Sequence, residues 1–164
     1  MRGPTLLATV AAAVVLWPSP SRGQSVAMRP LPELRADLIA GAQPALQIGA
    51  GLQIPMGIYV RTGIDLAVGS ALGNVPTSSR LDGRMDLLTR FLLDPYGQTA
   101  WGISAGGGLS LRAEPGDRVR PLLLVALDIE GRRSARGIAP AVQIGLGGGV
   151  RIGAVLRRAI GQRR

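Results

Sequence analysis

The chain has 164 residues with neither cysteine nor histidine, and its formal net charge is +9 at pH 7. Without these two residue types the chain can form no disulfide, thiolate nucleophile, Ser-His-Asp triad or histidine-ligated zinc site. We therefore expect a non-enzymatic protein with no cofactor and no metal site. Its length is typical of a single domain.

The N-terminal segment has the organisation of a secretory signal peptide. Arg2 supplies a positive charge, residues 6–17 form an apolar run, and residues 18–27 are small or turn-forming. We expect cleavage after Gly23, or as late as Ala27, which leaves residues 24–164 as one domain. The apolar run is shorter than the about 20 residues that a spanning helix needs, so an uncleaved anchor is the weaker alternative.

Turn-forming residues divide the rest of the chain into eight short segments. In chain order they are 34–43, 45–54, 57–69, 83–93, 101–112, 119–130, 141–147 and 150–161. The first alternates between apolar and polar residues except at Ile39, but it also fits a helix that begins near Pro32. Segments 45–54 and 57–69 alternate almost without fault. A period of two residues predicts β-strands.

The remaining segments follow the same rule with two ambiguities. Segment 83–93 alternates but also has some helical character, whereas 101–112, 119–130 and 141–147 alternate clearly. The last segment, 150–161, fits a strand or a helical stripe. We favour strands throughout because every well-determined neighbour is a strand.

The non-apolar face of these segments carries paired charges separated by glycine. Arginines and acids lie two or four residues apart, as in Arg35 with Asp37, Arg61 with Asp65, and Arg84 with Asp86. The predicted interior ion-pair residues are Arg35, Asp37, Arg61, Asp65, Arg84, Asp86, Arg120, Asp128 and Glu130. Glycine relieves crowding inside a narrow barrel, and buried charges need partners. Counted over all segments, this face holds eight arginines and five acids, and the surplus predicts trapped water, anions or a partly open end.

The apolar face is continuous in all eight segments, and none of them is marked as a polar edge strand. A closed barrel has no edge to protect, and apolar residues outside with charges inside are the pattern of a transmembrane barrel. We therefore expect an all-β fold, an eight-stranded antiparallel up-and-down barrel.

In these features the chain resembles the small outer-membrane barrels of the OmpA and OmpX kind. It departs from them in its few aromatic residues, its short loops and its C-terminal sequence "RRAIGQRR". The resemblance implies a bacterial outer-membrane location, contact with outer-membrane lipid and with the barrel-assembly machinery, a plugged lumen, and a structural or surface-interaction role. The alternative is a soluble periplasmic lipocalin-like barrel or sandwich that binds an apolar ligand or partner.

Two further patterns have plain interpretations. The stretch "GLGGGVRIG" (145–153) lacks the last glycine of a dinucleotide-binding fingerprint and has no acidic residue after it, so it predicts a tight turn. Arg157, Arg158, Arg163 and Arg164 predict a solvated basic tail, with contact to lipid phosphates as the alternative. Without interleaved aromatic residues, we expect no nucleic-acid partner.

Overall fold

The computed structural model describes residues 29–73, 80–96, 98–114 and 118–158. Within these ranges the chain forms eight β-strands, and it contains no helix that is long and apolar enough to cross a membrane. The strands are β1 (Leu31–Ala40), β2 (Ala45–Pro55), β3 (Val60–Ala71), β4 (Leu81–Leu92), β5 (Gly102–Glu114), β6 (Arg118–Glu130), β7 (Ile138–Leu146) and β8 (Val150–Arg158).

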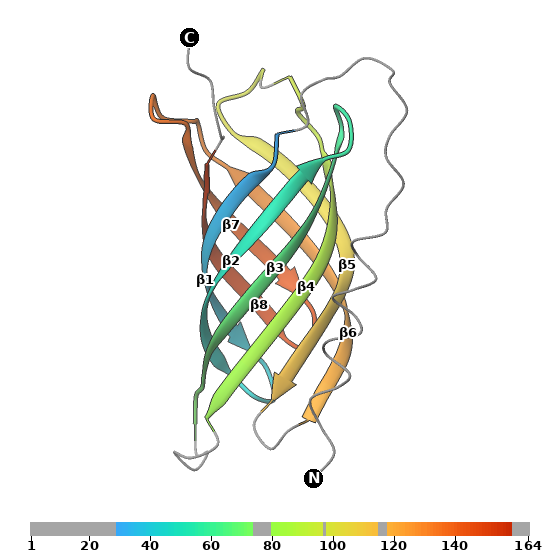
Figure 1. Cartoon of the computed structure of the whole chain (residues 1–164), viewed down its shortest axis with the longest axis vertical. Helices are drawn as coiled ribbons and strands as arrows, with labels where there is room; N and C mark the ends of the chain where they lie inside the picture. Colours follow the sequence, from blue (N-terminus) through green and yellow to red (C-terminus); the bar gives the residue numbers. More distant parts are fainter. Residues whose placement is uncertain (1–28, 74–79, 97, 115–117, 159–164) are drawn as a thin grey trace.

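The strands close into a single barrel in sequence order (Figure 1). Each strand pairs antiparallel with its neighbours in the chain, and β1 pairs with β8 to complete the ring. The predicted fold class is therefore confirmed: the chain is an all-β, eight-stranded, antiparallel up-and-down barrel. The three segments that also had helical character, 34–43, 83–93 and 150–161, form strands, because each has a ladder partner on either side. Residues 159–161 of the last expected segment lie outside the described residues.

The predicted strand boundaries shift by up to three residues at several ends. β1 begins at Leu31 and β4 begins at Leu81, whereas the expected segments began at residues 34 and 83. Pro32 and Gly83 are turn-forming residues, but here both lie within ladders, opposite Leu52 and Val68 respectively. Glu33 precedes the first expected segment and Asp82 lies in the expected connection before segment 83–93, but both are strand residues in the structure.

The two ends of the barrel carry different connections. The upper end, uppermost in Figure 1, carries the start of β1, the end of β8 and connections 56–59, 93–101 and 131–137. The lower end carries the connections between β1 and β2, β3 and β4, β5 and β6, and β7 and β8. The last of these is the turn predicted at residues 147–149, and Gly148 and Gly149 adopt positive φ values of 73° and 147° there.

The two faces of the wall differ sharply in chemistry. Apolar side chains such as Leu66, Leu109 and Ile144 are exposed on the outside, whereas charged side chains of the same strands are buried inside. Among the described residues, the buried apolar cluster is small and consists of Leu88, Leu124 and Ala126. The inside of the barrel, called the lumen below, is therefore held together mainly by polar contacts.

Glycines on the inner face let neighbouring strands approach closely. A Cβ atom added to Gly108 would collide with the carbonyl oxygen of Leu87, and one added to Gly106 would collide with that of Thr89. Both collisions are with the backbone of β4, which a side-chain rotation cannot relieve. Glycine at these positions permits the tight wall of a small barrel.

Candidate functional site

The lumen contains a continuous network of arginines and carboxylates. Its arginines are Arg35, Arg61, Arg84, Arg90, Arg112, Arg151 and Arg157, and its acids are Glu33, Asp37, Asp65, Asp82, Asp86, Asp128 and Glu130. Strand alternation places these side chains on the inner face, and every acid in the set has at least one arginine partner. All of these residues except Arg61 and Glu130 are buried.

Arg35 forms the middle of the network. Its Nε donates to Asp37 Oδ2 at 2.7 Å on the same strand, and its Nη1 donates to Asp65 Oδ2 at 2.5 Å on β3. Nη2 of the same guanidinium donates to Asp37 Oδ1 at 3.0 Å and also bonds Gln143 Oε1 on β7. One planar guanidinium thus connects three strands, as its fork of N–H donors allows.

Toward the upper end, Arg157 of β8 takes a similar position. Its guanidinium reaches Glu33 Oε2 at 3.0 Å, Asp128 Oδ1 at 2.7 Å and Glu130 Oε2 at 3.1 Å. Arg90 of β4 approaches Asp128 from the other side, with Nε 2.9 Å from Oδ2. Asp128 therefore joins β4, β6 and β8 across the lumen.

Toward the lower end, the acids of β4 have arginine partners from three strands. Asp86 Oδ2 lies 3.0 Å from Arg84 Nε and 2.7 Å from Arg151 Nη1. Asp82 Oδ2 lies 2.6 Å from Arg112 Nη2, and Asp82 Oδ1 accepts a hydrogen bond from the side-chain amide of Gln47. These contacts join β4 to β2, β5 and β8.

The lumen is balanced in charge, which corrects the predicted surplus of arginine. Glu33 and Asp82, which lie outside the expected segments, add two acids to the inner face. Arg120 is removed from it, because its side chain is 56% exposed and pairs with Glu114 at 3.3 Å where β5 meets β6. The network of seven arginines and seven acids is then balanced, and so is the separate pair of Arg120 with the buried Glu114. The net charge of the chain therefore lies outside these residues.

The structure brings together two of the three predicted neighbour pairs. Arg35 lies 2.7 Å from Asp37, and Arg84 lies 3.0 Å from Asp86. Arg61 instead pairs with Glu130 at 3.1 Å, whereas Asp65 contacts Arg35 and Arg90. The separation of four residues places Arg61 about two pleats up the strand from Asp65, near the upper mouth.

Arg157 is counted among the eight arginines of the inner face and also in the predicted basic tail, and the structure places it on the inner face. It is 2% exposed and has three carboxylate partners in the lumen, whereas Arg158, the next residue, is exposed on the outer side. Strand β8 continues through this part of the sequence, so alternation turns one arginine inward and the next outward. Arg163 and Arg164 lie outside the described residues.

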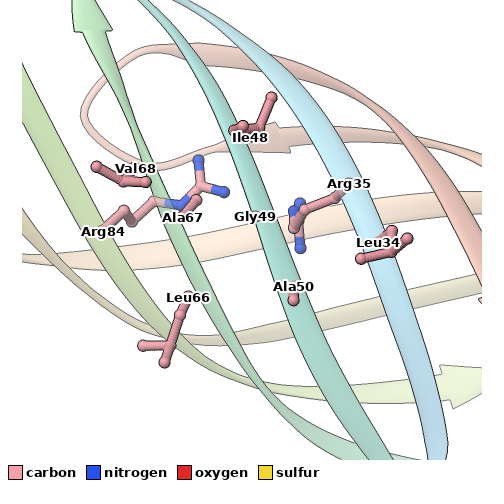
Figure 2. A pocket seen from close by; sticks show the side chains of 9 residues that line it. All are labelled: Leu34, Arg35, Ile48, Gly49, Ala50, Leu66, Ala67, Val68 and Arg84. Atoms are coloured by element: carbon pink, nitrogen blue, oxygen red, sulfur yellow. The ribbon is translucent and has the colours of Figure 1, made fainter.

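The barrel wall that surrounds this network is thin, and its outer surface is apolar. Figure 2 shows part of it over β1, β2 and β3, where Leu34, Ile48, Leu66 and Val68 surround a shallow depression. The depression is floored by Gly49, Ala50 and Ala67, and the guanidinium groups of Arg35 and Arg84 also line it. Because these wall residues are small, little more than the backbone separates the charged lumen from the apolar exterior at this point.

The four described aromatic residues all lie toward the upper end. Tyr59 is in connection 56–59, and Tyr96 and Trp101 are in connection 93–101. Phe91 lies near the end of β4, opposite Val60 on β3. Tyr59 and Tyr96 contact each other edge to face, with ring centroids 6.4 Å apart. Aromatic residues at one level of an apolar barrel are typical of a membrane–water interface.

Among the described residues, no group of His, Cys, Asp and Glu side chains is arranged to hold a metal ion. Compared with protein-family models and with curated proteins, the chain finds no match. The case for a function therefore depends on the geometry of the barrel itself.

Proposed function

We propose that the chain is an integral protein of a bacterial outer membrane, a non-enzymatic barrel with a plugged lumen and a structural or surface-interaction role. One observation carries the proposal: apolar side chains cover the outside of all eight strands, whereas the charged side chains pair with one another inside. In water this arrangement would expose an apolar surface far larger than monomeric soluble proteins tolerate. In a bilayer the same surface contacts acyl chains.

The strand lengths suit this location. The strands have 9 to 13 residues, and a tilted strand needs about 9–11 residues to cross the hydrocarbon core. Ring closure gives each strand two ladder neighbours, as a bilayer requires of backbone polar groups. Such a protein reaches its membrane through export and the barrel-assembly machinery, in agreement with the signal peptide that we expect at residues 1–23.

The side chains inside the barrel support the proposal of a plugged lumen. Eight strands leave an interior just wide enough for side chains. Here that interior holds long arginines whose guanidinium groups lie 2.5–2.9 Å from carboxylates of other strands. An ion would have to break these contacts to pass.

A lipocalin-like soluble barrel needs the opposite arrangement of faces. Such a protein places its apolar face inside and uses it to hold an apolar ligand. In this chain Leu66 is 56% exposed on the outer side of β3, whereas Asp65 beside it is 1% exposed. The described inner face is lined mainly by charged and amide side chains, so we favour the membrane protein.

Site-directed labelling tests the membrane location, and the absence of native cysteine simplifies it. Single cysteines replace Leu66, Leu109 and Ile144, which are exposed on β3, β5 and β7. Each carries a polarity-sensitive dye, and the protein is reconstituted into vesicles with brominated acyl chains. We expect strong quenching at all three positions, because bromine then lies against every side of the barrel.

The control positions are in a connection and in the lumen. A dye on cysteine at Gln98, exposed in connection 93–101, should be quenched weakly. Cysteine at Ala67, which is buried and faces inward, should react with a polar maleimide only after unfolding. Weak quenching at all outer positions, together with recovery of the protein in the soluble fraction without detergent, would reject the proposed location.

A further inference from the structure

A second apolar depression crosses the outer wall near the upper end, over β1, β8, β7 and the end of β6. Its outward-facing lining residues are Leu34, Ala36, Trp101, Ile129, Pro140, Val142, Ala154 and Leu156. The volume of this open depression is about 770 Å³, within the range of roughly 300–1,000 Å³ that is usual for small-molecule sites. Its lining is almost entirely apolar, in contrast to the lumen behind it.

Small residues form the floor of this depression and larger ones its sides. Ala36 and Ala154 are register partners on β1 and β8, and Val142 lies opposite Ala154 on β7. Leu34 and Leu156 are likewise partners, one pleat closer to the upper end. The alanines leave a channel that runs along the wall between longer side chains.

Trp101 borders the depression at the level of the upper connections. Its ring lies 3.5 Å from the position that a Cβ atom of Gly131 would occupy, and the ring of Pro140 lies 3.3 Å from the same point. The indole therefore reaches across the end of β6 toward β7. Tryptophan prefers this level of a bilayer, where its ring meets both acyl chains and head groups.

Two arginines lie at the edge of this apolar depression. Arg132 and Arg136 of connection 131–137 line an adjoining hollow together with Ile138, Pro140 and Leu156. Pro140 and Leu156 line both hollows, so the basic and apolar parts form one surface.

A third arginine lies at the same edge of the depression. Arg158 is exposed on the face of β8 that carries Leu156, and its register partner is Ile138. Among the ion pairs of the described residues, none involves Arg132, Arg136 or Arg158, whereas Arg133 between them pairs with Glu130 at 3.7 Å. Three guanidinium groups are thus available to an anion at this margin.

We propose that this surface binds a phospholipid with a negatively charged head group, such as phosphatidylglycerol. One acyl chain lies in the channel over Ala36 and Ala154, and the phosphate is held by Arg132 and Arg136, with Arg158 beside it. Guanidinium groups bind phosphate through paired N–H donors, and basic residues next to a membrane span attract anionic lipid. A free phosphate would satisfy the arginines but leave the apolar channel empty. This inference rests on the proposed membrane location.

Fluorescence of Trp101 provides a direct test, because the chain contains only one other tryptophan, Trp17. The variant Trp17→Phe is reconstituted in phosphatidylcholine vesicles with a small mole fraction of brominated phosphatidylglycerol or, separately, brominated phosphatidylcholine. We expect brominated phosphatidylglycerol to quench Trp101 much more strongly, with enrichment at the site on the order of tenfold. Added inorganic phosphate should not remove this preference.

Variants separate the two parts of the site. Arg132→Gln with Arg136→Gln should abolish the preference for phosphatidylglycerol, and Ala154→Phe should reduce quenching by filling the channel while it leaves the arginines unchanged. Arg120→Gln, which removes one charge at the lower end, is the control and should retain the preference.

The outcomes distinguish failure of the lipid site from failure of the membrane location. Equal quenching by the two brominated lipids, or a preference that survives the double arginine variant, would overturn the lipid site alone. A stronger preference for lipopolysaccharide, or association of two barrels through the alanine channel in place of lipid, would overturn it as well. Absence of quenching by either brominated lipid at any mole fraction would instead contradict membrane insertion.

Discussion

Arg157 Nη2 and Asp128 Oδ1 lie 2.7 Å apart across the upper half of the lumen. They belong to β8 and β6, which share no ladder, since β7 separates them. The same guanidinium contacts Glu33 on β1, so a single side chain joins both sides of the closing seam between β1 and β8 to β6. Contacts of this kind fix the shape of the barrel interior.

Removal of Arg157 should therefore destabilise the barrel strongly. Arg157→Leu leaves Glu33 and Asp128 with fewer compensating charges in the lumen, and breaking a buried pair in this way costs about 3–5 kcal/mol. The free energy of unfolding in urea, measured in vesicles, gives the cost. Arg158→Leu is the matched control and should change it by no more than about 0.5 kcal/mol, because Arg158 is exposed. Equal effects at the two positions would contradict the inward orientation of Arg157.

The partner of Arg61 can be established with double-mutant cycles. Arg61 Nη1 lies 3.1 Å from Glu130 Oε2, and both side chains are partly exposed near the upper mouth. We expect Arg61→Gln and Glu130→Gln to be coupled by about 1 kcal/mol. Arg61→Gln and Asp65→Asn should be additive to within about 0.5 kcal/mol, since they share no contact. Strong coupling of Arg61 to Asp65, and none to Glu130, would restore the pairing expected from sequence spacing.

Two adjacent glycines of β5 should respond oppositely to the same substitution. Gly108 faces the lumen, where an added Cβ meets the carbonyl of Leu87, and we expect Gly108→Ala to destabilise by about 1–3 kcal/mol. Gly107 faces outward with the nearest atom, the carbonyl oxygen of Leu124, at 3.5 Å, and it does not have a positive φ. Gly107→Ala should be neutral or stabilise by up to about 1 kcal/mol, because alanine restricts the unfolded chain. Urea unfolding compares the two variants, and a similar loss in both would argue against close packing on the inner face.

The barrel should not form an open pore. Single-channel recording in a planar bilayer should show no stable, reproducible conductance for the native chain. Steps comparable to those of a general porin would contradict a plugged lumen. Removal of side chains from the middle of the network, as in Arg35→Ala with Arg90→Ala, offers a positive control, because any conductance that appears must pass through the space they occupied.

The sequence by itself was sufficient to predict the strands and the faces of the wall. Alternation is a local property, so residues such as Arg35 and Asp37 must share a face in any strand. Continuity of the apolar face over eight segments, together with glycine on the other face, indicated closure into a barrel. The same reasoning was ambiguous at 34–43 and 150–161, where apolar residues fit both a period of two and a helical stripe.

Only the tertiary structure decided which charges meet. An arginine side chain is long enough to pass its nearest neighbour and reach a carboxylate on another strand, so the pairs depend on register and on ring closure. Spacing along β3 therefore suggested Asp65 for Arg61, whereas closure brings Glu130 of β6 to it. The positions of the strand ends could not be predicted from local rules either. Glu33 follows a proline and Asp82 precedes a glycine, and both neighbours are typical of turns. In the structure, the ladders with neighbouring strands include both acids and point their carboxylates into the lumen.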